Sequence, residues 1–314
     1  MSDPALTDTL PTSAAMRVIR RIEVVANPAS GHTGPDAPEA AARIFAEFGL
    51  EPNIRKVQPH ELMAALKSAV DAAPDLLVLI AGDGTAGTAA SLCGPDGPLI
   101  APLAGGTMNM LPHALYGLKD WKTALRETLA EGVVTSVSGG EVDDLRFYVA
   151  AILGEPALWA EAREAVRGGD LVLAARKARD ALKRAFSSRL RFQVGPGDTT
   201  KCEALSLMCP LVSRGMEDDA RALEVAVLTP KGLPDAFRLG AHALMADLIG
   251  DWRKDPSVNV TPCRAGTAWA SGRIPAILDG EPIRLHKRVD FRFVPIAFRA
   301  LAPPRAAPPS ATPA

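Results

Sequence analysis

The feature that most constrains the fold of this chain is an apolar run that ends in a glycine turn. Residues 76–80 read Leu-Leu-Val-Leu-Ile, and residues 81–85 read Ala-Gly-Asp-Gly-Thr. An uninterrupted apolar run of this length is typical of a strand that is buried on both faces, as in a parallel sheet. The glycines allow a ligand to approach the backbone closely, so that their N–H groups can face phosphate oxygens. A buried strand with a phosphate-binding turn at its carboxyl end is therefore predicted.

The first half of the chain alternates strand and helix patterns. Strands separated by helices predict parallel βαβ units and an α/β domain of the Rossmann-like type. We expect strands at residues 18–26, 53–57, 76–80, 99–103 and 133–137, and helices at residues 38–48, 59–72, 85–92 and 121–131.

The second half has a different pattern. Residues 189–194, 222–227 and 289–293 alternate apolar and polar side chains. Such alternation predicts antiparallel sheets with one polar face, most simply a β-sandwich. Two helices, at residues 156–186 and 235–249, are expected to interrupt these strands.

The domain organisation follows from this change of pattern near residues 138–140. We expect an α/β domain at residues 16–138 and a sandwich domain at residues 139–302. The ends, residues 1–15 and 303–314, are rich in Pro, Ala, Ser and Thr and are expected to be disordered tails.

Composition excludes several classes of function. The net charge of −1 gives no electrostatic case for a nucleic-acid partner, and 5% aromatic residues give few stacking platforms. The four cysteines lack metal-ligand spacing, which favours buried reduced thiols. There is no apolar run long enough to span a bilayer and no signal-peptide pattern, so a cytoplasmic protein is expected.

Three glycine-containing turns each follow a predicted strand of the first domain, at residues 27–31, 82–85 and 105–109. Neighbouring parallel strands would bring these turns together at one sheet edge, with the hydroxyls of Ser30, Thr85 and Thr107 beside them. Neither a Walker A motif nor a Gly-x-Gly-x-x-Gly helix start occurs, which disfavours P-loop NTPases and typical dinucleotide dehydrogenases. The turns predict a nucleotide site, and the lone carboxylate of Asp83 within it favours phosphoryl transfer.

The ordered set of motifs resembles the diacylglycerol kinase catalytic domain family, which includes bacterial lipid kinases and sphingosine kinases and is distantly similar to NAD kinases. The motifs are Asn-Pro-x-Ser-Gly at residues 27–31, Gly-Asp-Gly-Thr at 82–85, Pro-Leu-x-Gly-Gly-Thr-x-Asn at 102–109 and Asp-Gly-Glu at 279–281. The resemblance covers roughly residues 18–295. It implies a nucleotide-binding α/β domain, a β-sandwich whose last segment returns to the first domain, ATP with Mg²⁺, and a lipid acceptor.

The resemblance also implies roles for individual residues. Asp83 would accept the proton of the lipid hydroxyl or position that hydroxyl. Glu281 would lie near the nucleotide and its Mg²⁺, both as a catalytic residue and as a metal ligand. The implied nucleotide contacts are Asn27, Ser30, Gly31, Gly82, Gly84, Thr85, Gly106, Thr107, Asn109 and Asp279.

The implied function is an ATP-dependent lipid kinase acting on a diacylglycerol- or sphingosine-like acceptor at the inner membrane surface, with peripheral attachment and a homodimer as one candidate assembly. A basic amphipathic stretch at residues 171–186 is a candidate membrane contact, although a solvated helix packed on the sandwich explains the same pattern.

Departures from the family pattern keep alternatives open. Gly87-Thr88 and Met110 stand where the family carries acidic or amide groups, and Ala81 replaces a glycine. A kinase of a soluble hydroxyl compound such as NAD, or a binding protein without turnover, therefore remains an alternative. Asp83 can also be read as a helix cap, and residues 279–281 as a simple hairpin turn.

Overall fold

A computed structural model of the chain describes residues 10–31, 33–154, 190–213, 221–228 and 258–304. The chain divides into two compact units. The first comprises Met1–Val137 with Ile296–Ala314, and the second comprises Ser138–Pro295. The sequence placed this boundary after residue 138, and it assigned residues 296–302 to the second domain as a last strand that returns to the first.

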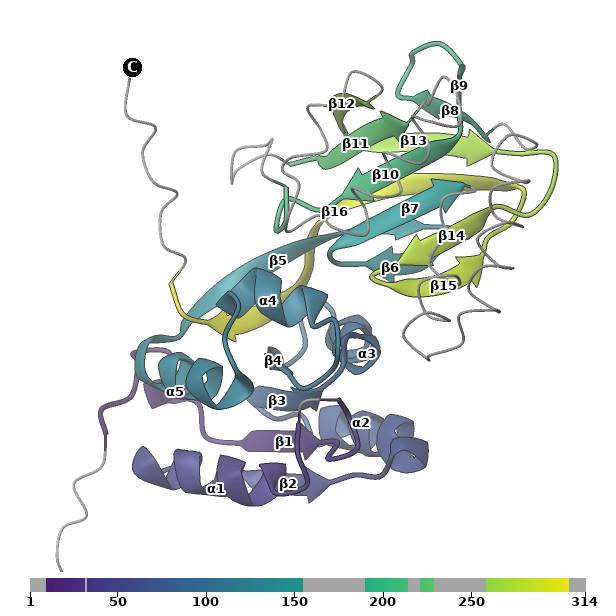
Figure 1. Cartoon of the computed structure of the whole chain (residues 1–314). Helices are drawn as coiled ribbons and strands as arrows, with labels where there is room; N and C mark the ends of the chain where they lie inside the picture. The colour runs from purple at the N-terminus through teal and green to yellow at the C-terminus, as the bar shows by residue number, and fades with distance from the viewer. Residues whose placement is uncertain (1–9, 32, 155–189, 214–220, 229–257, 305–314) are drawn as a thin grey trace, which may run out of the picture. The chain divides into compact units, whose positions relative to one another are not determined.

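The first unit is built on a parallel sheet with strand order β2-β1-β3-β4 (Figure 1). Every pair in this set is parallel, as expected for βαβ units. All residues of β1 and β3 are buried, which explains the apolar sequence of β3 and, apart from Glu23, that of β1. The strands are β1 (Ile22–Ala26), β2 (Asn53–Lys56), β3 (Leu76–Ala81) and β4 (Leu99–Ala104).

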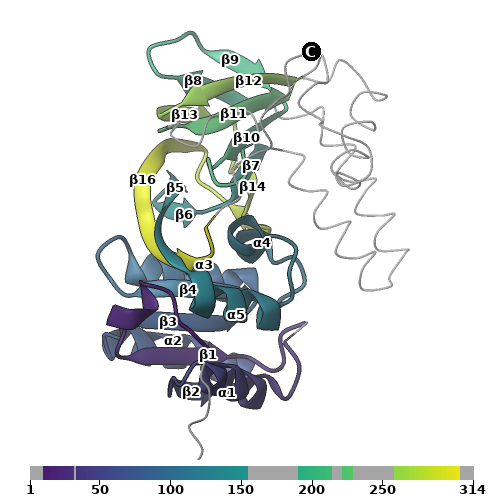
Figure 2. The same ribbon diagram turned by 90° about the vertical axis from the view of Figure 1, so that its left-hand side faces the viewer.

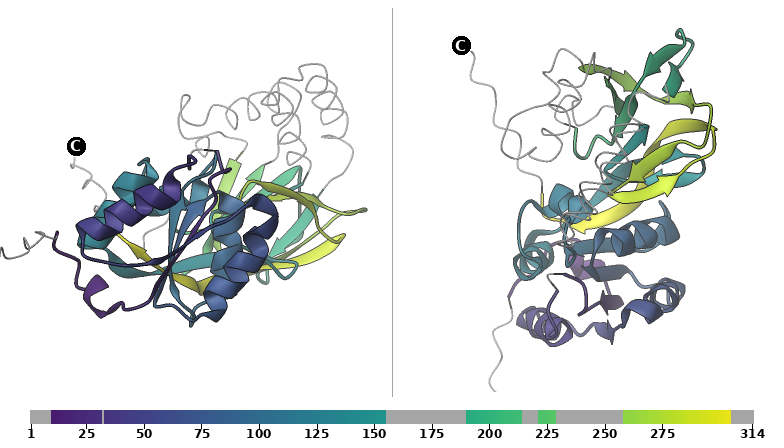
Figure 3. Two further views of the ribbon diagram at one scale, coloured as in Figure 1. Left: turned by 90° about the horizontal axis from the view of Figure 1, so that it is seen from below. Right: turned by 45° about the vertical axis from the view of Figure 1, so that its right-hand side comes forward.

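Helices cover both faces of this sheet. Helix α1 contacts α5, helix α2 contacts α3, and the two pairs lie on opposite faces (Figure 3). Helix α5 begins where the side chain of Asp120 accepts hydrogen bonds from the N–H groups of Lys122 and Thr123, a typical N-cap. The helices are α1 (Ala37–Glu47), α2 (Leu62–Asp71), α3 (Asp83–Cys93), α4 (Met110–Tyr116) and α5 (Trp121–Glu131), with 3-10 turns η1 (Met16–Val18) and η2 (Pro59–Glu61).

The chain returns to the first unit at its carboxyl end. Strand β16 (Arg288–Ala302) is long enough to belong to both units, and Ala300 pairs with Ile100 of β4 in parallel (Figure 2). The hydroxyl of Tyr116 donates to the carbonyl of Leu301 at 2.9 Å. The last strand therefore completes the sheet of the first unit.

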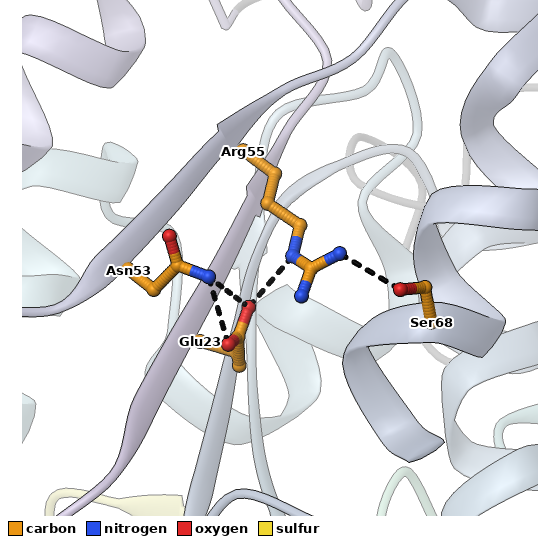
Figure 4. Close-up of polar contacts among 4 residues, drawn as sticks. All are labelled: Glu23, Asn53, Arg55 and Ser68. Carbon is orange, nitrogen blue, oxygen red and sulfur yellow. Dashed lines mark hydrogen bonds and ion pairs between the residues drawn. The ribbon is translucent and has the colours of Figure 1, made fainter. Parts of the chain in front are cut away.

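A buried carboxylate ties three elements of this unit together (Figure 4). Glu23 of β1 is 9% exposed and accepts hydrogen bonds from Asn53 and from Nε of Arg55, the latter at 2.7 Å. Arg55 also donates to the hydroxyl of Ser68 on α2 at 3.0 Å. A buried charge is tolerated when it is paired and hydrogen-bonded, so this network stabilises the edge strand β2.

The second unit contains two antiparallel sheets. Strands β13, β8, β9 and the first part of β16 belong to one sheet, together with β5 and β6, while the other has the order β12-β11-β10-β7-β14-β15. The bounds are β5 (Val133–Val142), β6 (Leu145–Phe147), β7 (Ala150–Gly154), β8 (Leu190–Val194), β9 (Thr200–Cys202), β10 (Ala204–Met208), β11 (Leu223–Leu228), β12 (Val258–Cys263), β13 (Ala265–Trp269), β14 (Pro275–Leu278) and β15 (Glu281–Arg284).

One hydrophobic core lies between these two sheets. It takes Phe192 and Phe291 from the first sheet and Leu205 and Leu207 from the second, all of them buried. A shared core of inward-facing residues from two sheets is the defining feature of a sandwich. The predicted fold class, an α/β domain followed by an antiparallel sandwich, is therefore confirmed.

Several local expectations differ from the structure. The predicted strand at residues 18–26 begins only at Ile22, because residues 16–18 form a 3-10 turn in which the N–H of Ile19 donates to the carbonyl of Met16. The predicted amino-terminal tail is shorter than expected, since the N–H of Leu10 donates to Glu47 and that of Ser13 to Leu129. The helices expected at residues 156–186 and 235–249, including the basic stretch 171–186, lie outside the described residues.

Candidate functional site

The candidate site is at the carboxyl edge of the parallel sheet in the first unit. Strands β1, β3 and β4 are neighbours, and each is followed by one of the three glycine turns. Their turns, residues 27–31, 82–85 and 105–109, therefore leave the sheet side by side. Ligands bind outside this edge in open α/β sheets.

The glycines of these turns are required because the backbones touch. A Cβ added at Gly106 would lie 2.6 Å from the Cα of Gly82, and one added at Gly105 would lie 2.7 Å from the backbone nitrogen of Ala81. A Cβ at Gly31 would lie 3.1 Å from the hydroxyl of Thr107. The three turns thus form one close-packed cluster, as the sequence predicted.

Asn27 shapes the first turn with its side chain. Its Oδ1 accepts the backbone N–H of Ala29 at 3.1 Å, and its backbone N–H donates to Ile80 of β3 at 3.1 Å. The residue is 8% exposed. An asparagine that bonds its own backbone two residues on is a common turn device, so the amide of Asn27 holds the turn and links it to β3.

Asn109 closes the third turn in a similar way. Its Oδ1 accepts the N–H of Gly106 at 2.7 Å, and its Nδ2 donates to the carbonyl of Gly106 at 2.8 Å. The residue has φ 51° and is buried, and asparagine is among the few residue types that adopt this left-handed conformation readily. Asn109 therefore fixes the conformation of Gly106 and begins helix α4.

Asp83 is the first residue of helix α3 and is partly buried. Its Oδ1 accepts the backbone N–H of Leu111 at 3.2 Å, in the first turn of helix α4. The carboxylate thus links two helices. The sequence left open that Asp83 caps a helix, and in the structure it caps α4 and not its own helix α3. This bond orients Asp83 at the edge where the three turns meet.

The polar groups exposed at this edge of the sheet are suited to binding an anion. Gly31, Gly84 and Thr107 are exposed, while Ser30 and Thr85 are partly exposed. The hydroxyl of Ser30 lies 3.6 Å from where a Cβ of Gly82 would be. Gly82 precedes the amino terminus of α3, where backbone N–H groups and the helix dipole favour negative charge. Hydroxyls, backbone donors and one carboxylate therefore share this surface.

The positions that depart from the family pattern add no further carboxylate to the edge. The hydroxyl of Thr88 donates to the carbonyl of Gly84 at 2.8 Å within α3, and Met110 is the first residue of α4. Among the described residues, no group of three or more His, Cys, Asp or Glu side chains is arranged to hold a metal ion.

Asp279 and Glu281 lie in the second unit, on the hairpin that joins β14 to β15. Leu278 pairs with Glu281, and both turn residues have positive φ, 46° at Asp279 and 91° at Gly280. This is the two-residue hairpin geometry that Asp-Gly favours. Glu281 is exposed at the start of β15.

The carboxylate of Asp279 is a structural anchor. It accepts the backbone N–H groups of Tyr148, Val149 and Ala150 at 2.7, 2.9 and 2.9 Å. Hydrogen bonds from three backbone donors stabilise the ionised form of a carboxylate. Asp279 thus ties the hairpin tip to the start of β7 and determines where the neighbouring Glu281 is displayed.

The cysteines are inert structural residues. All four are free and buried. Burial raises the pKa of Cys93 to about 11, and burial together with the charge of Glu203 raises the pKa of Cys202 to about 12. The thiolate is the reactive form of cysteine, so these side chains have no place in the chemistry of the site.

Comparisons with known proteins agree with this geometry. The family model for the diacylglycerol kinase catalytic domain matches residues 21–142, the segment that carries all three turns. A diacylglycerol kinase structure from Bacillus anthracis str. Sterne aligns over 91% of this chain and 98% of its own, with 13% identity and a TM-score of 0.64. A candidate diacylglycerol kinase from the same strain aligns over 91% and 98%, with 17% identity and a TM-score of 0.67.

No curated protein matches the sequence. The structural alignments, at these low identities, show a shared two-domain fold. The resemblance inferred from the motifs is thereby confirmed for the catalytic-domain segment, and the fold is confirmed for the chain.

Proposed function

Because residues 21–142 match the diacylglycerol kinase catalytic domain, we propose that this protein is an ATP-dependent kinase that phosphorylates a lipid hydroxyl. The observation that carries the proposal is the convergence of three glycine turns beside the carboxylate of Asp83. The fold alone would leave the function open, since one fold can host many activities. The proposal therefore rests on the site and on the family match.

The nucleotide phosphates would bind where the turns meet. Gly31, Gly82 and Gly84 let phosphate oxygens approach the backbone, and the helix α3 amino terminus supplies a favourable field. Gly106 is buried and donates its N–H to Asn109, so it would act by packing against Gly82. The hydroxyls of Ser30, Thr85 and Thr107 are available as further donors. Asn27 and Asn109 would act indirectly on the nucleotide, because their side chains hold the turns that present these groups.

Asp83 would accept the proton of the acceptor hydroxyl or hold that hydroxyl in line with the terminal phosphate. A carboxylate can do so when it lies within hydrogen-bond reach of the hydroxyl. The bond from Leu111 keeps this side chain in one orientation, which favours positioning. Most of the rate in phosphoryl transfer comes from positioning and electrostatics, so a single well-placed carboxylate is sufficient.

The described residues at this edge of the sheet offer Mg²⁺ a single carboxylate ligand. The ion is commonly held by one or two carboxylates together with substrate phosphates and water, and Asp83 supplies one carboxylate in the first unit. When bound, Mg²⁺ would neutralise charge that develops on the phosphate oxygens. The proposed role of Glu281 as a further ligand rests on its sequence motif, and Asp279 is better described as the residue that positions it.

A lipid acceptor is supported by the description of the matching family. Two alternatives differ in their products: a soluble acceptor such as NAD, or nucleotide binding without turnover. The absence of carboxylates at Thr88 and Met110 favours the last of these. The described residues contain no helix that is long and apolar enough to cross a bilayer.

The test is incubation of the purified protein with labelled ATP, Mg²⁺ and a total lipid extract. We expect one or more labelled lipids, identified by mass spectrometry. Transfer of label to NAD or another soluble compound, with none to lipid, would support the soluble-acceptor alternative. Nucleotide binding without any labelled product would support a binding protein.

A further inference from the structure

One face of the antiparallel sheet in the second unit carries a row of cations. Lys201 of β9 is directly opposite Arg191 of β8, Arg191 is opposite Trp269 of β13, and Trp269 is opposite Arg288 of β16. Residues directly opposite each other on paired antiparallel strands point to the same face, with Cβ atoms about 5 Å apart. These four residues, here called the basic row, therefore form a continuous stripe across four strands that are neighbours in Figure 1.

The basic row is exposed and its charges are not matched. Lys201, Arg191 and Arg288 are exposed, and within the part of the chain that the structure describes none of them forms an ion pair. Like charges placed directly opposite, as in Lys201 and Arg191, destabilise a sheet. Because no carboxylate of the described residues pairs with Lys201 or Arg191 to offset this repulsion, the pair points to a binding partner that carries negative charge.

Two acidic side chains near the basic row have partners that differ in charge. Asp290, two residues from Arg288 and so on the same face, accepts a hydrogen bond from Thr267 at 2.6 Å. Further along β16, Arg292 pairs with Glu141 at 2.6 Å. The hydroxyl of Thr267 is neutral, so Asp290 keeps its negative charge near Arg288, and the excess of positive charge is greatest at the other end of the basic row, at Lys201 and Arg191.

An aromatic side chain lies in the middle of the row. The guanidinium of Arg288 stacks over the ring of Trp269 at 5.2 Å, and the ring is partly exposed. Tryptophan is enriched at the water–bilayer interface, where its ring sits among the lipid headgroups. Basic side chains near an anionic leaflet are attracted to its surface potential. A tryptophan flanked by cations thus combines both kinds of contact.

We propose that the basic row is a docking surface for an anionic phospholipid bilayer. This inference deepens the proposed function, on which the choice of a membrane as partner rests. A net charge of −1 argues against general affinity for polyanions, whereas a local stripe of three cations and one tryptophan is suited to a charged lipid surface.

The test compares three forms of the full chain by co-sedimentation with phosphatidylcholine vesicles, with and without phosphatidylglycerol. The first is the unaltered protein, and the second carries Arg191→Glu and Arg288→Glu in the row. The third carries Arg17→Glu and Lys67→Glu, exposed residues of the first unit that give the same change in net charge. Circular dichroism establishes that each form is folded.

We expect binding that requires phosphatidylglycerol and that falls at least about twentyfold in the row variant, since each basic residue near an anionic surface contributes about fivefold. The control variant should bind nearly as well as the unaltered protein. Equal loss in both variants, or none in the row variant, would overturn the proposal. Row-dependent binding to single-stranded RNA in place of vesicles would also overturn it.

Kinase assays separate this inference from the proposed function. Phosphorylation of a short-chain, water-soluble diacylglycerol should be the same in the row variant and the unaltered protein, while phosphorylation of long-chain diacylglycerol in anionic vesicles should fall. If no form phosphorylates either acceptor, the proposed function fails, and the vesicle sedimentation still decides whether the row docks on membranes.

Discussion

The carboxylate of Asp83 accepts the backbone N–H of Leu111 at 3.2 Å and so joins the first turns of helices α3 and α4. The bond sets the direction of the only side-chain carboxylate that the three glycine turns contribute. Two glycine turns therefore determine the position of this carboxylate, because one turn contains Asp83 and the other leads into helix α4, which orients it.

Replacement of Asp83 by Asn tests the role of its charge. The amide oxygen of Asp83→Asn can still accept the Leu111 N–H, so the fold should be retained. Loss of a group that accepts or positions a proton typically costs about 100-fold or more in rate. We expect a loss of that size in lipid phosphorylation at constant enzyme concentration, with an unchanged melting temperature.

The matched control for that variant is Asp96→Asn, the same chemical change at an exposed residue of the first unit. It should turn over as the unaltered protein does. Normal turnover by Asp83→Asn would remove this carboxylate from the mechanism.

Replacement of Gly106 by Ala tests the close packing of the turns. The new Cβ would lie 2.6 Å from the Cα of Gly82, and the backbone cannot yield without moving a whole turn. Overpacking of this kind costs about 1–3 kcal/mol of unfolding free energy. We expect a lower melting temperature and weaker ATP binding, measured by thermal denaturation and calorimetry.

Gly272→Ala provides the comparison, because a Cβ at Gly272 meets nothing within 4 Å. It should be neutral in both measurements. If Gly106→Ala behaved like Gly272→Ala, the turns would not be packed as described.

Replacement of Asp279 by Asn tests the anchor of the β14–β15 hairpin. The Asn amide presents an NH₂ group where Asp279 offers an oxygen to backbone donors, so at least one of the three N–H groups loses its partner. An unsatisfied partly buried donor costs about 1–3 kcal/mol. We expect a loss of that size in urea denaturation, whereas Asp198→Asn, at an exposed position, should have no effect. Equal stability of the two variants would contradict the anchoring role.

Asp75 predicts a pH dependence of stability. Its Oδ2 accepts the backbone N–H groups of Arg20 and Arg21 at 2.8 Å each. The hydrogen bond from Arg21, followed by that from Arg20, lowers the pKa of Asp75 below its ordinary value of 3.8. A lowered folded-state pKa stabilises the fold above the unfolded-state value, and this contribution is lost as the pH falls through the folded-state pKa.

Asp75→Asn should therefore be less stable than the unaltered protein near neutral pH, and the difference should shrink as the pH falls below about 4. Urea denaturation at a series of pH values measures this difference directly. A difference that stayed constant over the whole series would show that ionisation of Asp75 does not contribute.

Much of the first unit could be predicted from its sequence, because the signals were local. The strand at residues 76–80 and the helix at residues 121–131 were predicted almost to the residue. Parallel neighbours then bring the turns that follow them to one edge by geometry alone. Helix α4 was missed, because it follows a left-handed Asn109 and contains Pro112, so that its sequence resembles a loop.

The contacts of the site could not be predicted in the same way, because they join residues far apart in the sequence. The bond from Leu111 to Asp83 spans 28 residues, and the bonds to Asp279 span about 130. Sequence motifs identified Asn27 and Asn109 as candidate ligand contacts, but a motif does not show which way an amide points. In the structure both amides bond to backbone atoms of their own turns.

A crystal structure of the protein with a non-hydrolysable ATP analogue and Mg²⁺ tests the proposed phosphate site most directly. We expect the triphosphate at the amino terminus of α3, against the backbone of Gly82 and Gly84, with Asp83 facing the terminal phosphate. A triphosphate bound elsewhere, with this edge of the sheet left to solvent, would contradict the proposed site.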